Sequence, residues 1–198
     1  MFTGIIEDLG TIKRIEQNGS NLSYWIDSPL ASSLKIDQSV SHNGVCLTVE
    51  EIIESSYKVT AIQETLNKTN LGLLKPGNAI NLERCMQMNG RIDGHIVQGH
   101  VDTTGKCIER IEKNGSWEFV FEVDSQFSNL IIEKGSICLN GISLTLFNVT
   151  KNTFKVAIIP YTYSNTNIKD IVINSVVNVE FDILGKYVQR MFENRKQN

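Results

Sequence analysis

Excess basic charge, long apolar runs and paired cysteines are all missing from this 198-residue chain. Lysine and arginine number 19 against 22 acidic residues, so the formal net charge is −3 and no strongly positive surface is offered to nucleic acid. No apolar stretch approaches the roughly 20 residues that a membrane-spanning helix needs. The first residues, MFTGIIEDLG, lack the basic start and the apolar middle of a signal peptide. We therefore expect a cytoplasmic protein without nucleic-acid or membrane partners.

Motifs for metal, nucleotide and hydrolase chemistry are missing as well. No C-x-x-C pair, P-loop, G-x-G-x-x-G or G-x-S-x-G is present, so we expect no metal site and find no local support for a nucleotide cofactor. The cysteines stand far apart and should be free thiols in a reducing compartment. They are Cys46, Cys85, Cys107 and Cys138.

Two of the three histidines lie in the segment GHIVQGHVD. His95 and His100 are five residues apart, and on a strand an odd separation points them to opposite faces. We therefore do not expect them to share a metal ion, and one could be useful while the other is structural.

What the chain does contain is a repeat. NGVCLTV at 43–49 returns as NGISLTL at 140–146, and INLE at 80–83 returns as VNVE at 177–180. A two-copy repeat of this length is too long for a solenoid, so each copy should be a domain with its own core. We place one domain at 1–89, a second at 90–182, and a C-terminal helix and tail at 183–198.

The pattern of each copy predicts short β-strands. Segments such as YKVTAI and FKVAII alternate and are rich in β-branched and aromatic residues, with Gly, Asn and Ser between them. Small closed antiparallel barrels fit this pattern because closure removes exposed edges; a sandwich is the alternative. Short helices are expected at SPLASSL and DSQFSNLI, where Ser or Asp can act as the N-cap.

The last segment, ILGKYVQRMFENRK, has no counterpart in the first copy. Its apolar residues fall on one face of a helix. That face could pack back on its own barrel, but burial against other chains is favoured, which predicts a homo-oligomer. The apolar residues are Leu184, Tyr187, Val188, Met191 and Phe192.

Equivalent positions of the repeat carry different chemical groups. Cys46 in the first copy corresponds to Ser143 in the second. Taken alone, Cys46 is a small buried hydrophobe and Ser143 an inward hydroxyl. Two similar barrels would nevertheless offer two similar pockets, which suits two similar ligands.

The motifs MFTGIIE, HNGVCLTV, ETLNKTNLG, GHIVQGHVD and NGISLTL closely resemble the riboflavin synthase family of the α-chain type. The likeness runs from Met1 to the C-terminal helix. It implies an all-β fold of two six-stranded Greek-key closed barrels with a C-terminal α-helix. It also implies a homotrimer in which the first barrel of one chain faces the second barrel of a neighbour.

The resemblance implies a dismutation in which two molecules of 6,7-dimethyl-8-ribityllumazine exchange a four-carbon unit. One becomes riboflavin and the other 5-amino-6-ribitylaminouracil. This is the final step of riboflavin biosynthesis and would need no cofactor or metal, because the electron-poor ring stabilises the carbanion formed at the 7-methyl group. Association with a lumazine synthase is left open.

Family roles carry over onto matching positions. Proton transfer and polarisation would fall to Cys46, His100, Ser143, Thr145 and Asp182. The first pocket would use Gly4, Ile5, Ile6, Cys46, Leu47, Thr48, Thr60, Ala61, Ile62, Gln63, Glu64, Thr65, Gly99, His100 and Val101. The second would use Lys134, Ser143, Leu144, Thr145, Ala157, Ile158, Ile159, Pro160, Tyr161 and Thr162.

Two positions depart from the family pattern. Asn140 stands where many members have Asp, and Tyr161 stands where a His or Glu is frequent, so contacts in the second pocket are in question.

The rival function is that of lumazine protein, a relative that holds a chromophore without catalysis. Oligonucleotide binding on small barrels would need a basic groove with exposed aromatics, which the charge balance disfavours.

Overall fold

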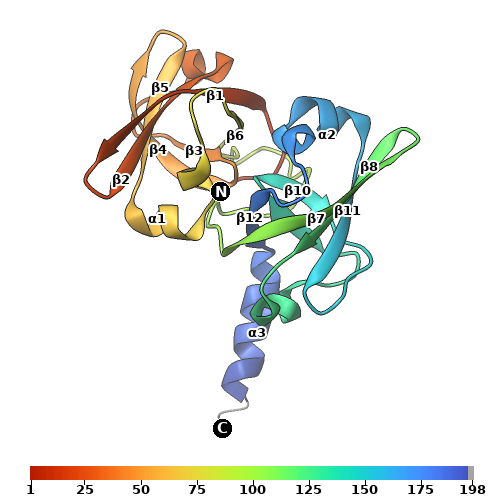
Figure 1. Cartoon of the computed structure of the whole chain (residues 1–198). Coiled ribbons are helices and arrows are strands. Elements are labelled where there is room, and N and C mark those ends of the chain that lie inside the picture. The colour runs from red at the N-terminus through yellow and green to blue at the C-terminus, as the bar shows by residue number, and fades with distance from the viewer. Residues whose placement is uncertain (196–198) are drawn as a thin grey trace.

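A computed structural model describes residues 1–195 of the chain, so residues 196–198 of the predicted tail lie outside the described residues. It contains two β-barrels and one long helix (Figure 1). The elements of the first barrel are β1 (Asp8–Asn18), β2 (Asn21–Asp27), η1 (Pro29–Ser33), β3 (Ser39–His42), β4 (Val45–Ile53), β5 (Ser56–Ala61), α1 (Gln63–Lys68), η2 (Leu71–Leu73) and β6 (Ala79–Arg84). Those of the second are β7 (Thr103–Lys113), β8 (Ser116–Glu122), η3 (Ser125–Leu130), β9 (Ser136–Leu139), β10 (Ile142–Thr145), β11 (Thr153–Ile158), α2 (Pro160–Asn165), η4 (Asn167–Asp170) and β12 (Val176–Phe181).

Both sheets have the same antiparallel strand order. The first is a closed barrel in the order β1-β2-β5-β4-β3-β6, and the second runs β10-β9-β12-β7-β8-β11, the same cyclic order. The second sheet closes just beyond the end of β10, where Phe147 and Lys155 of β11 exchange backbone hydrogen bonds of 3.0 and 2.8 Å. The barrel prediction is confirmed and the sandwich is excluded; the domain boundaries at residues 89 and 182 stay predictions.

The expected short helices form as 3₁₀ turns. The Ser28 side chain accepts a hydrogen bond from the Leu30 N–H at the start of η1. Asp124 accepts one from the Gln126 N–H at the start of η3. In both cases the cap satisfies a backbone donor that the first turn leaves free.

Asn-Gly pairs make the two hairpin turns of the repeated motif. Asn43 and Gly44 join β3 to β4 with φ of 48° and 80°, and Asn140 and Gly141 join β9 to β10 with φ of 45° and 83°. Two consecutive positive φ angles define the type I′ turn that suits the twist of a hairpin. The two turns lie against each other, since a Cβ on Gly44 would come within 2.8 Å of the Gly141 nitrogen.

Six buried asparagines fill the space between the barrels. They occupy three pairs of equivalent positions in the two copies of the repeat: Asn43 and Asn140, Asn70 and Asn167, and Asn81 and Asn178. The Asn70 N–H donates to the Asn178 carboxamide at 2.6 Å, and the Asn167 N–H donates to that of Asn81 at 2.8 Å. Because buried amides need partners, this network fixes one relative placement of the barrels.

Two segments cross from one barrel to the other. Residues 2–6 precede the first barrel, yet the Gly4 carbonyl accepts from the Ser143 N–H at 2.8 Å and Ile6 packs on the second core. Residues 97–101 precede the second barrel, yet the Gly99 carbonyl accepts from the Cys46 N–H at 2.9 Å. Phe2 and Val97, one from each segment, are bridged to each other.

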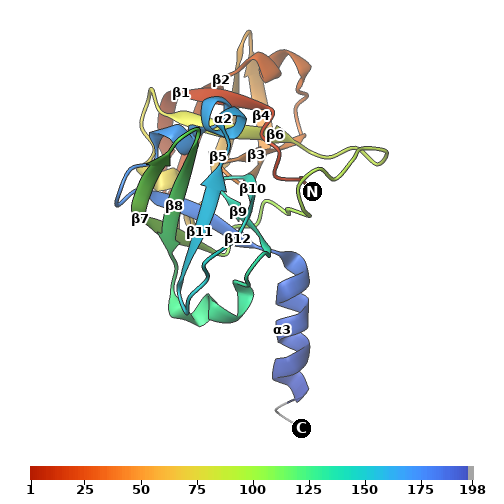
Figure 2. The same ribbon diagram turned by 90° about the vertical axis from the view of Figure 1, so that its right-hand side faces the viewer.

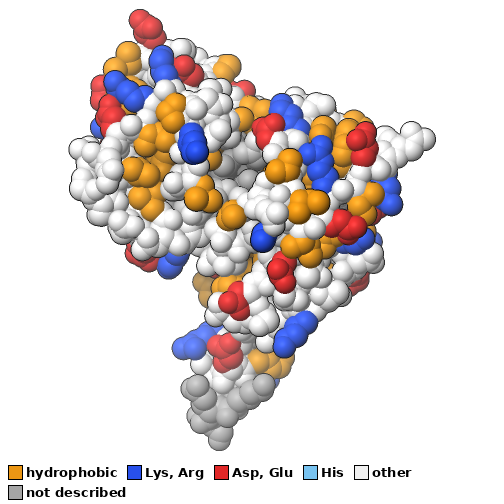
Figure 3. All heavy atoms as spheres, viewed as in Figure 1, with side chains coloured by type: hydrophobic (Ala, Val, Ile, Leu, Met, Phe, Trp, Pro, Cys, Tyr) orange, Lys and Arg blue, Asp and Glu red, His pale blue; other side chains and the backbone are white. Residues whose placement is uncertain are grey.

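Helix α3 (Ile183–Arg195) extends away from both barrels (Figures 1 and 2). Its first turn contacts η3, where Gly185 lies near Leu130. The five predicted apolar residues remain between 52% and 67% exposed, so the alternative that this face packs on the chain's own barrel is wrong. Apolar side chains also show on the visible face of both barrels (Figure 3).

Candidate functional site: two equivalent positions on two barrels

The first position is a pocket of about 230 Å³ between β4, α1 and the crossing segment 97–101. Six of its lining residues were predicted from the sequence: Cys46, Glu64, Thr65, Gly99, His100 and Val101. Val45, Lys68 and Thr69 complete it. The pocket thus brings together a thiol, an imidazole, a carboxylate and an amine on one surface.

Cys46 is half-buried at the base of this pocket. Gly99 passes so close that a Cβ there would come within 2.6 Å of the Cys46 Cβ, and its φ of +79° favours glycine for a second reason. Burial raises the pKa of the Cys46 thiol above its ordinary value. At neutral pH the group is therefore a thiol that can donate a hydrogen bond, not a thiolate nucleophile.

The second position surrounds Ser143 on β10. The Ser143 hydroxyl lies 2.7 Å from Nδ1 of His95, and its N–H donates to Gly4. Gly94 also crosses here, since a Cβ on it would come within 2.8 Å of the Ser143 Cβ. Burial lowers the pKa of His95, while nearby Asp182 acts in the opposite direction. The neutral imidazole is therefore favoured beside the hydroxyl.

The two positions have the same architecture and different chemistry. Each combines a β-strand residue after an Asn-Gly turn with a crossing segment that has a positive-φ glycine, and each barrel has a six-residue helix at the equivalent place of the repeat, α1 and α2. Where the first has Cys46 and His100, the second has Ser143 and Ile5, with His95 arriving from a different part of the chain. Identical ligands would therefore meet different polar groups.

Some predicted residues lie elsewhere. Gly4 and Ile6 were assigned to the first pocket, but they lie against the second barrel, because the chain crosses over before β1 begins. Ile5 lines a larger hollow of about 810 Å³ beside the 85–93 loop, which contains none of Cys46, His100 or Ser143. Cys46 and His100 lie together in the smaller pocket and not in this hollow.

Other predicted residues are buried in the barrel cores or lie on the surface outside the described pocket. Leu47, Ala61 and Ile158 are buried in the barrel cores, and Leu144 packs against the second core. Thr60 shares a hydrogen bond of 2.8 Å with the Ser23 hydroxyl. The exposed residues are Thr48, Ile62, Gln63, Thr145, Ala157, Ile159, Pro160 and Tyr161, and Thr162 is half-buried.

Asp182, Lys134 and Asn140 have structural contacts in this chain. The Asp182 carboxylate accepts from the Leu184 N–H at 3.0 Å and so caps α3. The exposed Lys134 lies over the Phe147 ring, with Nζ 5.9 Å from its centre. Asn140 belongs to the asparagine network between the barrels, so its departure from the family pattern falls outside the ligand position.

Sequence reasoning missed His95 as a site residue. It treated residues 95–100 as a strand, but this stretch is irregular apart from the bridge at Val97, so alternation does not decide where its side chains point. His95 and His100 do serve different places, one on each barrel. The presence of glycine before each histidine, at Gly94 and Gly99, was the signal for a close approach.

Within the described residues 1–195, no group of three or more His, Cys, Asp or Glu is arranged to hold a metal ion. None of the described helices combines the length and the apolar character needed to cross a membrane.

Comparison with known proteins places the chain in a family. The lumazine binding domain family matches it twice, at residues 3–85 and 98–182. The riboflavin synthase of Bacillus subtilis (strain 168) is 37% identical over 199 residues, covering 100% of this chain and 93% of that protein. The riboflavin synthase of Actinobacillus pleuropneumoniae is 40% identical over 191 residues, covering 96% and 89%.

Solved structures share the fold. LumP complexed with riboflavin superposes with a TM-score of 0.86 at 22% identity, covering 91% of this chain and 99% of that one. LumP complexed with 6,7-dimethyl-8-(1'-D-ribityl) lumazine gives 0.84 at 22% identity with the same coverage. Since the domain model matches both barrels and the curated relatives align along nearly the whole chain, this protein belongs to the riboflavin synthase family of tandem lumazine-binding domains.

Proposed function

We propose that this protein is a riboflavin synthase that uses its two equivalent positions as a pair. Two molecules of 6,7-dimethyl-8-ribityllumazine would react, one gaining four carbons to become riboflavin and the other losing them to become 5-amino-6-ribitylaminouracil. The main observation in support is that the site architecture is duplicated while the equivalent strand positions differ, with Cys46 in one and Ser143 in the other. One substrate must play two roles, and two similar but unequal positions provide for this.

We infer that the two positions serve each other between chains and not within one chain. Helix α1, which borders the first position, and its repeat equivalent α2 belong to different barrels and lie on different sides of the molecule (Figure 1). A homotrimer, with the first position of one chain facing the second position of a neighbour, would bring two lumazines together. Holding both rings in place removes much of the entropy cost of their encounter.

The exposed face of α3 supports this assembly. Leu184, Tyr187, Val188, Met191 and Phe192 form a continuous apolar face that the described residues leave uncovered. Packing such faces between copies around a closed symmetry axis would bury them. Association with lumazine synthase stays a prediction without a contact to argue from.

We assign proton transfer to His100 in the first position, because its imidazole is exposed on the pocket wall and can act as a general acid or base. The Cys46 thiol would donate to the developing negative charge of the ring there. In the second position, Ser143 would polarise the other lumazine, with neutral His95 able to accept its proton. Thr145, Asp182 and the remaining predicted contacts stay predictions. The electron-poor ring stabilises the carbanion itself, so the proposed reaction uses no metal or cofactor and transfers a four-carbon unit.

The test is to mix purified protein with the lumazine and follow riboflavin absorbance. Sustained riboflavin formation is expected, while binding without product would favour the antenna function of a lumazine protein. A Cys46→Ser, Ser143→Cys double variant should fold like the wild type but form riboflavin more slowly. Full activity of that variant would contradict distinct roles for the two positions.

A further inference from the structure

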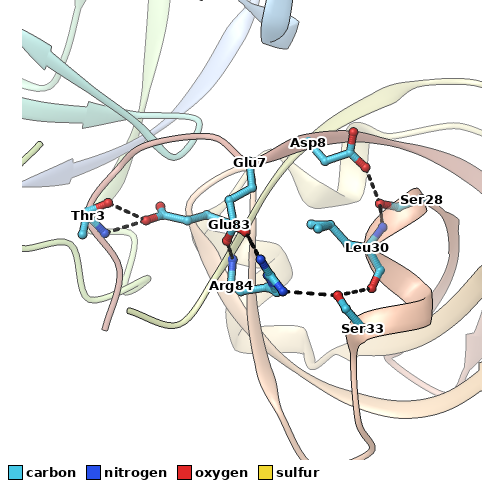
Figure 4. A network of polar contacts seen from close by, with 8 residues as sticks. All are labelled: Thr3, Glu7, Asp8, Ser28, Leu30, Ser33, Glu83 and Arg84. Carbon is cyan, nitrogen blue, oxygen red and sulfur yellow. Dashed lines mark hydrogen bonds and ion pairs between the residues drawn. The ribbon is translucent and has the colours of Figure 1, made fainter. Parts of the chain in front are cut away.

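Two equivalent glutamates hold the two crossing segments. Glu83 lies on β6 of the first barrel and Glu180 on β12 of the second, and both are at least 96% buried. Glu83 accepts from the Thr3 N–H at 2.6 Å, the Thr3 hydroxyl at 2.9 Å and the Gly4 N–H at 3.0 Å. Figure 4 shows Glu83 extended toward Thr3, away from the neighbouring Arg84–Glu7 ion pair. Glu180 accepts from the Gln98 N–H at 2.6 Å and the His100 N–H at 2.8 Å.

The carboxylates replace a β-ladder that ends at these points. The Glu7 N–H still donates to the Leu82 carbonyl, and the Asp102 N–H donates to the Val179 carbonyl in the equivalent place. Beyond these bonds each crossing segment leaves its own barrel. The N–H groups of Thr3 and Gly4 then donate to the buried Glu83 carboxylate, and those of Gln98 and His100 donate to Glu180. Such charge-assisted bonds are shorter and stronger than neutral ones.

Each glutamate therefore acts on the opposite barrel's ligand position. The segment held by Glu180 carries Gly99 and His100 into the pocket around Cys46. The segment held by Glu83 carries Gly4 against Ser143. A buried carboxylate costs free energy unless it is fully bonded, which makes the position of each segment sharply defined.

We propose that Glu180 and Glu83 are positioning residues, each of which sets the ligand position of the other barrel through the backbone of a crossing segment. Glu180 places His100 in the first pocket, and Glu83 places Gly4 beside Ser143. This rests on the proposed function for the identity of the ligand, but not for the placement of the segments.

The experiment compares Glu180→Gln with Glu83→Gln in the full chain, since a glutamine side chain offers a single acceptor oxygen in place of two. Amide exchange should become at least ten-fold faster at Gln98 and His100 in the first variant only, and at Thr3 and Gly4 in the second only. Riboflavin is then titrated while the methyl signal of Thr65 reports the first position and the imidazole ring signals of His95 report the second. We expect at least ten-fold weaker binding at the first position in Glu180→Gln and at the second position in Glu83→Gln.

Equal effects of both variants at both positions, or no effect on amide exchange, would overturn the proposal. If wild-type protein binds no riboflavin, the proposed function fails while amide exchange still decides the positioning role. If one variant does not fold, exchange of the four amides in the wild-type chain decides: slow exchange supports the bonds to the glutamates, and unprotected exchange refutes them.

Discussion

Gly44 and Gly141 face each other across the contact between the two barrels. A Cβ on Gly44 would lie 2.8 Å from the Gly141 nitrogen, and a Cβ on Gly141 would lie 2.9 Å from the Gly44 nitrogen. Each glycine also ends its hairpin turn at positive φ. The repeated Asn-Gly thus does two things at once: it closes each hairpin and lets the two hairpins meet backbone to backbone.

Replacing Gly141 by alanine should cost much more stability than the same change at Gly115. Both residues have positive φ, 83° and 91°, but nothing lies within 4 Å of a Cβ on Gly115. We expect Gly115→Ala to lower the free energy of unfolding by about 1 kcal/mol through backbone strain alone. Gly141→Ala should lose about 2 kcal/mol more because backbone atoms must move apart. Urea unfolding measures both, and equal losses would show that the two turns are not in contact.

The asparagine network should be sensitive to single truncations. Asn81 donates to the Asn140 carbonyl and to the Asn167 carboxamide at 2.9 Å each, and accepts from the Asn167 N–H. Asn81→Ala leaves these buried groups without partners and should lower the free energy of unfolding by about 2–4 kcal/mol. The exposed Asn67 is the control, since Asn67→Ala should change it by no more than about 0.5 kcal/mol. A neutral Asn81→Ala would mean that the barrels do not depend on this network.

His42 should make stability depend on acid pH. It is fully buried with Nε2 2.8 Å from the Tyr57 hydroxyl, and burial lowers its pKa from 6.5 to about 4. Since the unfolded chain binds the proton more readily, stability present above pH 6.5 is lost as pH falls toward about 4, by roughly 3 kcal/mol.

Glu83 and Glu180 also make stability depend on pH, because burial raises their pKa values. Comparison with a His42→Gln variant separates the His42 contribution from theirs. The difference in unfolding free energy between the two proteins should shrink by that amount from pH 7 to pH 4. A difference that does not change with pH would show that His42 titrates normally.

The apolar face of α3 should hold the oligomer. Met191→Glu places a charge within this face, whereas Gln189→Glu adds the same charge outside it. We expect Met191→Glu to sediment as a smaller species and Gln189→Glu to behave as wild type. A chain ending at Asp182 should also dissociate. An unchanged oligomer in both Met191→Glu and the shortened chain would place the interface elsewhere.

Local chemistry made much of this fold predictable. Local sequence specifies the Asn-Gly turns and the helix caps at Ser28 and Asp124, and the repeat is visible in the sequence itself. None of these features depends on distant contacts. The pocket residues Cys46 and Thr65 followed from the family resemblance and do lie together.

The crossing segments could not be predicted in this way. Gly4 meets Ser143 because residues 2–6 pair with the far half of the chain, and nothing in their own pattern specifies that partner. The same holds for His95, whose placement depends on an irregular stretch held by Val97. Such non-local pairings are decided by the packing of the two barrels, which a single sequence does not reveal.

The most direct test of a reaction between two lumazines is the ratio of lumazine consumed to riboflavin formed. Purified protein is supplied with 6,7-dimethyl-8-ribityllumazine as the sole substrate, and the lumazine consumed and the riboflavin formed are measured together by chromatography. We predict two lumazines consumed for each riboflavin, with one 5-amino-6-ribitylaminouracil released. Lumazine that is bound but recovered unchanged, or a ratio of one to one, would contradict a reaction between two lumazines held in paired positions.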